Sequence, residues 1–311
     1  MKSKYQNASL YSLCKTSIMK LKSVAFLSVL ILTTSVAQAN ASTSIQWNSQ
    51  TNITGTVTIP ANTVVTVAPN TRIKVGAGAK VVVLGQLLAP KGLTLSGSNW
   101  QGLIVNGSAA LTNFVEKGAR ESFYVATGGT LDINGGDISG VVGASRVDGT
   151  FTAKNLRYVK GSGNGITSSK DSGSVSIDGG TFSGPARGAG DFFSFSAGQL
   201  LKITDSSITK VHCAFHITGI QNMEIDGVDI ENTAYGFMMY GSSDTGARTI
   251  TNTTITNNDY GFDEGSGYTK NGLITISNSY IKNNKTNLGL FTKKVTISSP
   301  ANKPLQTSPK S

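Results

Sequence analysis

The chain contains two histidines, and both lie in the segment HCAFHITG. In a strand, Cys213, Phe215 and Ile217 would alternate toward a core. His212 and His216 would then project together from the opposite face. Because an imidazole changes charge near neutral pH, such a pair is a candidate for general acid–base catalysis. The competing interpretation is an ordinary polar strand face.

Which residues lie beside the histidines depends on a repeat that runs through the chain. Its unit is apolar-x-apolar, four residues, another apolar residue, then a Gly or Asn turn. The clear copies are LDINGGDISG, VSIDGGTFSG, LKITDSSITK, MEIDGVDIEN, RTITNTTITN and ITISNSYIKN, and FTAKNLRYVKG is a weaker copy. A third apolar segment follows each late copy, for example CAFHITG or YGFMMYG.

Three short strands in each repeat of about 20 to 26 residues are typical of a parallel β-solenoid, because one coil buries its inner face only against the next coil. The composition agrees, with 36 Gly and only 14% charged residues. We therefore predict an all-β fold, a parallel β-helix formed by a single chain, with roughly 9 to 11 coils of about 20 to 26 residues.

Counting through the coil intervals places two acidic residues on the same face as the histidines. Asp259 and Asp263 fall two coils after His212 and His216. Each coil adds roughly 4.8 Å, so His216 and Asp263 should lie on the order of 10 Å apart. That separation admits a sugar ring but is too long for a direct His–carboxylate pair or a shared metal. These four residues are the catalytic candidates, and no metal site or cofactor is predicted.

Three further side chains lie near this face and are candidates for ligand binding. Tyr235, Met238 and Tyr240 occupy the coil between the histidines and the acids. Their side chains could offer a platform on which a sugar ring stacks. The parity of Tyr235 with Phe237 could instead turn the Tyr235 ring inward.

Asparagines recur at one turn of the late coils. The predicted structural ladder consists of Asn232, Asn257 and Asn283 at one position and of Asn258 and Asn284 at the next. Stacked side-chain amides can hydrogen-bond along the axis and to the turn backbone. The alternative role for these amides is sugar binding.

The first residues have the features of an export signal. Lysines precede the apolar run VAFLSVLIL, and AQA follows it at residues 37–39. We predict a cleavable signal peptide at 1–39, a β-helix domain at 40–299 and a Pro/Ser/Lys-rich tail at 300–311, with a secreted or periplasmic location. Met1 and Met19 are both possible starts. A membrane anchor is the alternative, but the run has about half of the roughly 20 apolar residues that a span needs.

Removing such a signal lowers the formal net charge from +10 to +5, because five lysines precede residue 40. This weak positive charge predicts no nucleic-acid partner, and no membrane span is expected in the mature chain. Cys213 is expected to be a lone buried thiol. Lys154, Arg157 and Lys160 are expected to form a small solvated basic patch.

The units ITNTTITNNDYGF and ITISNSYIKNN, together with NITGTVTIPANTVVTVAPNTRIKVGAGAKVVVLGQLLA and WQGLIV, resemble the right-handed, pectate-lyase-like parallel β-helix superfamily over roughly residues 45–299. The resemblance implies a right-handed β-helix. It implies no single activity, since the superfamily includes lyases, hydrolases, epimerases, esterases, phage tailspikes and non-catalytic surface proteins. Of the polygalacturonase-type strings, Asn-Thr-Asp, Asp-Asp and Gly-His-Gly are absent.

Two functions from different classes follow as expectations. The first is a secreted, non-catalytic β-helix that binds or organises a surface polysaccharide, a matrix or a cell-surface partner, and acts as a monomer. The second is a polysaccharide lyase or epimerase on an acidic uronate polymer, in which the histidines and aspartates transfer protons. The expected partner is an acidic polysaccharide or a cell-surface partner.

Overall fold

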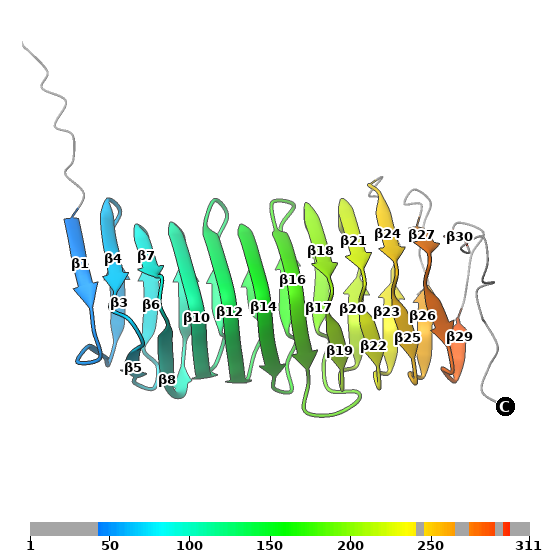
Figure 1. The fold of residues 1–311 in the computed structure, drawn as a ribbon, viewed down its shortest axis with the longest axis horizontal. Coiled ribbons are helices and arrows are strands. Elements are labelled where there is room, and N and C mark those ends of the chain that lie inside the picture. The colour runs from blue at the N-terminus through cyan, green and yellow to red at the C-terminus, as the bar shows by residue number, and fades with distance from the viewer. Residues whose placement is uncertain (1–42, 241–245, 265–273, 290–294, 299–311) are drawn as a thin grey trace, which may run out of the picture. The chain divides into compact units, whose positions relative to one another are not determined.

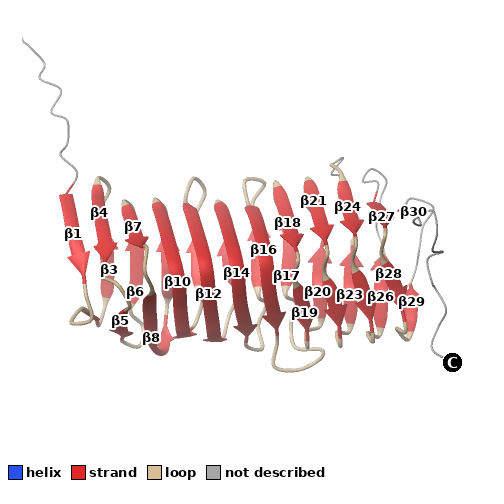
Figure 2. Cartoon of the chain, in the orientation of Figure 1, coloured by secondary structure: helices blue, strands red, loops and turns tan. Residues whose placement is uncertain are grey.

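The computed structural model describes residues 43–240, 246–264, 274–289 and 295–298. Every regular element in these ranges is a strand, as the all-red arrows of Figure 2 show. All strand pairs are parallel (Figure 1). No helix in the described ranges is long and apolar enough to cross a membrane. The predicted signal peptide and C-terminal tail lie outside the described residues.

The strands form two sheets, of 19 and 11 strands, and wind over three faces. Face A holds β1 (Thr43–Trp47), β4 (Thr63–Val67), β7 (Gln86–Ala89), β18 (Leu200–Thr204), β21 (Asn222–Asp226), β24 (Arg248–Thr251), β27 (Ile274–Ser277) and β30 (Val295–Ser298). Face B holds β2 (Asn52–Ile53), β5 (Thr71–Val75), β8 (Leu93–Trp100), β19 (Ser207–Thr209), β22 (Asp229–Glu231), β25 (Thr254–Thr256) and β28 (Tyr280–Lys282).

Four long strands cross from face A to face B without a break and join these faces into the 19-stranded sheet. They are β10 (Ser108–Ala119), β12 (Thr130–Val141), β14 (Thr150–Lys160) and β16 (Ser174–Ser183). Face C is the 11-stranded sheet. It holds β3 (Thr56–Ile59), β6 (Lys80–Val83), β9 (Gly102–Val105), β11 (Phe123–Val125), β13 (Ser145–Val147), β15 (Ile166–Ser169), β17 (Phe193–Ala197), β20 (Cys213–Ile217), β23 (Tyr235–Met239), β26 (Tyr260–Glu264) and β29 (Thr286–Leu288).

The strand register measures the coil length directly. Thr43 pairs with Thr63, an offset of 20 residues, and Ser174 pairs with Leu200, an offset of 26 residues. Each coil contributes one strand to face C, so the 11 strands there correspond to 11 coils. The predicted all-β parallel solenoid is therefore confirmed, with the predicted coil length.

The core consists of columns of identical or similar side chains. Ile203, Ile225 and Ile250 are consecutive partners on face A and are all fully buried. On face C, Phe193, Phe215 and the phenylalanines of the next two coils form a stack with ring centroids 5.3, 4.7 and 5.6 Å apart. Each fully buried Ile or Phe stabilises the fold by about 1.5–3 kcal/mol through burial.

Along most of the bend between faces A and B an Asn or Asp alternates with a Gly, all with positive φ. The stack is Asn70, Gly92, Asn113, Gly135, Asn155, Gly179, Asp205, Gly227 and Asn252, and the next coil places Asn278 there instead of a glycine. A Cβ at Gly135 would lie 2.8 Å from the Asn113 Oδ1 atom, and one at Gly179 would lie 2.9 Å from Asn155 Oδ1. At these coils the Asn side chain fills the space over the next coil, where a glycine fits without a shift.

The asparagines of the late coils divide into two rows. Asn232, Asn257 and Asn283 are exposed and have φ of 53°, 58° and 57°, so they form the left-handed turn itself. Asn258 and Asn284 are buried: Asn258 Nδ2 donates to Asn284 Oδ1 at 3.0 Å, and the backbone N–H of Asn258 donates to the same oxygen at 2.9 Å. The hydrogen bonds along the axis therefore run through the second row.

One buried carboxyl group, that of Glu116, lies in a column of core side chains. Glu116 is fully buried on β10, in the column of Leu95 and Ile138. Its Oε1 accepts the backbone N–H of Ala119 at 3.0 Å, and its Oε2 has no hydrogen-bond partner. Burial raises the pKa of Glu116 to about 7. The protonated form is favoured because a charge in this core is poorly solvated.

Candidate functional site

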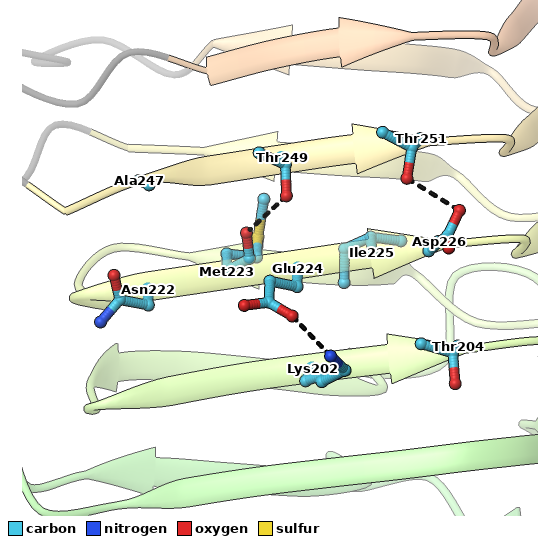
Figure 3. A pocket seen from close by; sticks show the side chains of 10 residues that line it. All are labelled: Lys202, Thr204, Asn222, Met223, Glu224, Ile225, Asp226, Ala247, Thr249 and Thr251. Carbon is cyan, nitrogen blue, oxygen red and sulfur yellow. Dashed lines mark hydrogen bonds and ion pairs between the residues drawn. The ribbon is translucent and has the colours of Figure 1, made fainter.

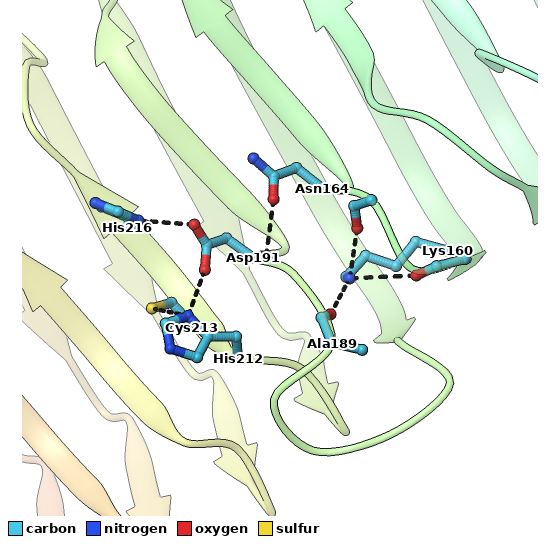
Figure 4. Close-up of polar contacts among 9 residues, drawn as sticks. Lys160, Asn164, Ala189, Asp191, His212, Cys213 and His216 are labelled. Atoms are coloured by element: carbon cyan, nitrogen blue, oxygen red, sulfur yellow. Dashed lines mark hydrogen bonds and ion pairs between the residues drawn. The ribbon is translucent and has the colours of Figure 1, made fainter.

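The two histidines converge on a carboxylate that the sequence analysis did not include. His212 Nδ1 lies 2.9 Å from Asp191 Oδ1, and His216 Nδ1 lies 2.7 Å from Asp191 Oδ2. Figure 4 shows the two imidazoles reaching Asp191 from opposite sides. Each carboxylate oxygen therefore has one imidazole as its partner.

Asp191 is ionised at neutral pH. Burial by itself would raise its pKa, but hydrogen bonds from His216, His212 and Cys213 outweigh burial and lower the pKa to about 2. An ionised carboxylate only accepts hydrogen bonds, so each Nδ1 atom must carry the proton. In neutral imidazoles the Nε2 atoms then keep their lone pairs, which can accept a proton or a hydrogen bond.

The loop that carries Asp191 is held on both sides. The Asp191 backbone N–H donates to Asn164 Oδ1 at 3.0 Å, and its carbonyl accepts the Gly165 N–H at 2.8 Å. Lys160 Nζ donates to the carbonyl oxygens of Gly163, at 2.7 Å, and of Ala189 (Figure 4). The carboxylate is thus positioned before any ligand arrives.

The structure corrects the expectation that Lys160 belongs to a solvated basic patch, because Lys160 is buried. The pairing of β12 with β14 shifts after Ser139, so that Lys160 pairs with the buried residue Val141. Burial lowers the pKa of Lys160 to about 8, against the opposing attraction of Asp191. A strictly alternating strand pattern, which ignores this shift, predicts that the Lys160 side chain points to solvent.

Cys213 is a free and buried thiol. This confirms the expected lone buried thiol, and its Sγ lies 3.2 Å from His212 Nδ1, so the thiol also borders the polar cluster. Burial and the charge of Asp191 both raise the pKa of the Cys213 thiol. The side chain is therefore a thiol at neutral pH and a poor nucleophile.

One outward row on face C links His216 to a predicted acid. His216 pairs with Met238, and Met238 pairs with Asp263, so Asp263 lies two coils from His216 in the same row. Met238 is only 8% exposed. It fills the space between His216 and Asp263 and offers little of its own surface to a ligand.

Asp259 lies in a different environment from the histidines. Its Oδ1 is 2.8 Å from Arg187 Nη2 and 2.6 Å from Lys285 Nζ. Asp259 and Lys285 border an open hollow of about 450 Å³, which Ala234, Tyr235, Asp259, Tyr260, Lys285 and Thr286 line, and Arg187 reaches Asp259 from outside this lining. A carboxylate paired with two cations is poorly suited to remove a proton, so the geometry favours a binding role for Asp259.

The tyrosines of face C are half-buried and lie against neighbouring rings. Tyr235 stacks on Tyr260 with ring centroids 4.8 Å apart and planes 6° apart, and the ring centroid of His212 lies 5.3 Å from that of Tyr235. Tyr240 lies beside His216, with centroids 5.2 Å apart. Tyr235 is not part of the buried core, and it lines the hollow beside Asp259 together with Tyr260.

Another hollow lies on the outer surface of face A, with a volume of about 250 Å³ (Figure 3). Its charged groups already have partners: Lys202 Nζ lies 2.7 Å from Glu224 Oε2, and Thr251 Oγ1 donates to Asp226 Oδ1 at 2.8 Å.

The string Arg-Ile-Lys, one of the polygalacturonase-type strings, occurs at residues 72–74, on β5 of face B. It lies on a different face from the histidines.

Sequence reasoning missed Asp191, Arg187 and the pairing of Lys285. One signal was present: face C pairs Phe193 with Phe215, an offset of 22 residues, so counting back from Cys213 leads to Asp191. Arg187 carries no such signal, because it lies in the irregular loop before β17. Only the folded loop brings its guanidinium to Asp259.

Comparison of the chain with protein-family models, with curated proteins and with solved structures finds no match. Function must therefore be inferred from the chemistry of face C.

Proposed function

We propose that this chain is an exported, right-handed β-helix of the pectate-lyase-like superfamily that binds an acidic polysaccharide on face C without transforming it. The repeated units and their parallel stacking support the superfamily assignment. The observation that carries the binding proposal is the ion-pair cluster at the open hollow, where Arg187 and Lys285 share the single carboxylate of Asp259.

The charge of this cluster suits an anionic ligand. Two cations against one carboxylate leave one positive charge, and the Lys285 side chain is 77% exposed. A guanidinium can hold a second carboxylate or a sulfate through its remaining N–H groups. The hydroxyl edges of Tyr235 and Tyr260, which line the same hollow, can hydrogen-bond sugar hydroxyls.

The hollow is open, so a long chain can cross it without threading through a tunnel. Binding should be measured by co-sedimentation and by calorimetry with polygalacturonate, alginate and chondroitin sulfate, with a neutral glucan as the uncharged comparison. We expect binding to the acidic polymers alone, and Arg187→Ala and Lys285→Ala should each weaken it about tenfold at low ionic strength.

Lys202→Ala is the matched control, because Lys202 also forms an exposed ion pair with a carboxylate but lies on face A. It should bind like the wild type. Equal affinity of the wild type, Arg187→Ala and Lys285→Ala would contradict the proposed site.

A second candidate function rests on a separate observation, the hydrogen bonds from His212 and His216 to Asp191. A carboxylate-oriented imidazole is a common general base. In a lyase, an Nε2 atom would take the C5 proton of a uronate while the C4–O bond breaks, a C4–C5 double bond forms and the leaving oxygen takes a proton from solvent. In an epimerase, a proton would return to C5 from the other side.

The assay for this alternative follows the ultraviolet absorbance of unsaturated products and, for epimerisation, the proton spectrum of the polymer. For the enzyme, His216→Ala should abolish turnover while the far-ultraviolet circular dichroism spectrum of the variant stays that of the folded protein. Polymers that bind but are recovered unaltered in both assays would exclude the catalytic function in favour of binding alone.

Export is part of the proposal and rests on the N-terminal segment of lysines, apolar run and AQA. Amino-terminal sequencing of the protein recovered from outside the cytoplasm should start at Asn40. Recovery of an uncleaved chain from the cytoplasm would contradict the proposed export.

A further inference from the structure

Metal-ligating side chains that are scarce in this chain meet at one point. The sequence holds two histidines and two cysteines. His212, His216 and Cys213 surround the carboxylate of Asp191, and the second cysteine is Cys14. A donor atom of Asp191, of Cys213 and of His216 all lie within 4.8 Å of one another.

We propose that Asp191, Cys213 and His216 bind one divalent transition-metal ion, with zinc as the best match, and that a water molecule completes its coordination. One imidazole nitrogen, one carboxylate oxygen and one sulfur, with an open position for water, are a donor set that zinc accepts in proteins. Calcium and magnesium prefer oxygen alone, so imidazole and sulfur select against them.

The distances suit a site whose ligands are held together by protons until the metal binds. His216 Nδ1 is 2.7 Å from Asp191 Oδ2. Tetrahedral zinc with its usual bond lengths needs roughly 3.3–3.8 Å between ligand atoms, so this pair would have to move apart by roughly half an ångström. His212 Nδ1, 2.9 Å from Asp191 Oδ1, would remain a hydrogen-bond partner of the carboxylate.

Charge and protons balance in this step. The His216 imidazole stays neutral, because the proton of Nδ1 is replaced by one on Nε2 as the Nδ1 lone pair turns to the metal. Cys213 binds as a thiolate and releases one proton to solvent. With Asp191 and the thiolate, two negative charges would then face the divalent ion.

The cluster is accessible to solvent from one side only, the side of the two histidines. Asp191 and Cys213 are buried, whereas the side chains of His212 and His216 are 39% and 28% exposed. The ion would reach the ligands from the solvent side. Asn164 and Lys160 already hold the loop that carries Asp191, so little further ordering of this loop is needed when the ion binds.

The test uses the untagged full-length chain, stripped with a chelator and titrated with Co²⁺ and then with Zn²⁺. We expect one saturable equivalent of Co²⁺, intense visible bands of tetrahedral cobalt, a sulfur-to-cobalt charge-transfer band in the near ultraviolet, and displacement of Co²⁺ by Zn²⁺. His216→Ala should weaken binding by at least about tenfold, and His212→Ala, which removes only a hydrogen-bond partner of Asp191, should weaken it less. Cys213→Ser should remove the charge-transfer band and keep the visible bands.

Asp229→Asn is the matched control, because Asp229 is an exposed carboxylate on face B; its titration should equal that of the wild type. Far-ultraviolet circular dichroism establishes that each variant is folded. The inference is overturned if the wild type takes up no stoichiometric Co²⁺, or if folded His216→Ala and Cys213→Ser bind it as the wild type does. Metal uptake is read without polysaccharide, so this result is independent of the proposed function.

Discussion

His216 Nδ1 lies 2.7 Å from Asp191 Oδ2, although 25 residues separate the two in the sequence. The solenoid turns this distance along the chain into adjacency, since Ser194 and His216 are direct partners on neighbouring coils. The loop before β17 then places the carboxylate beside both imidazoles. One acidic residue therefore sets the orientation of both histidines.

Asp191→Asn should destabilise the protein by about 2–3 kcal/mol, because two hydrogen bonds to a charged acceptor are replaced by weaker contacts. The histidines are partly exposed, so the loss is smaller than for a fully buried pair. Urea denaturation followed by tyrosine fluorescence measures it. The exposed variant Asp229→Asn should change stability by less than about 0.5 kcal/mol. Equal stability of both variants would show that the histidines do not depend on Asp191.

Glu116 should make the protein more stable in mild acid than at neutral pH. Its pKa rises from 4.5 to about 7 on folding. The folded state therefore holds this proton more tightly, and the stabilisation present below pH 4.5 is lost as the pH rises to about 7, by on the order of 3 kcal/mol. Above pH 7 the contribution should be constant.

Unfolding free energies of the wild type and of Glu116→Gln, measured from pH 4.5 to 8, check this expectation. The variant should lack the fall in stability, because a buried amide does not ionise in this range. Parallel curves for the two proteins would show that Glu116 does not titrate in the core.

Lys160→Met should loosen the loop that carries Asp191. The substitution keeps the apolar stem but leaves the carbonyl oxygens of Gly163 and Ala189 without the ammonium group, at a cost of about 2–3 kcal/mol. Hydrogen exchange should report faster opening at the backbone amides of Gly165 and Asp191. Lys154→Met, at an exposed position of the same strand, is the control. Unchanged exchange at both amides would rule out Lys160 as the anchor.

Gly135→Ala should destabilise the protein by about 1 kcal/mol more than Gly78→Ala. Both glycines have nearly the same φ, 74° and 73°, so the backbone penalty is shared. A Cβ at Gly78 meets no atom within 4 Å, whereas one at Gly135 would meet Asn113 Oδ1 at 2.8 Å. Thermal denaturation compares the two variants. Adding Asn113→Gly should remove the extra cost, and equal costs for the two single variants would show that the alternation has no steric basis.

The sequence by itself determined the fold class, the coil length and which aliphatic residues form the core. Ile225 and Ile250 recur at the spacing of one coil, and burial of these side chains requires them to lie on top of each other. A regular pattern of this kind predicts structure, because each coil must bury its apolar side chains against the matching side chains of the next coil. For the same reason the sequence placed Asp263 in the row of His216.

Tertiary structure alone decided where the irregular parts of the chain bring their side chains. Asp191 and Arg187 lie in the loop before β17, where no repeat specifies the direction of a side chain. The shift in pairing after Ser139 buries Lys160, which an unbroken alternation would expose. These contacts depend on the path of the backbone in three dimensions, and the candidate site is made of them.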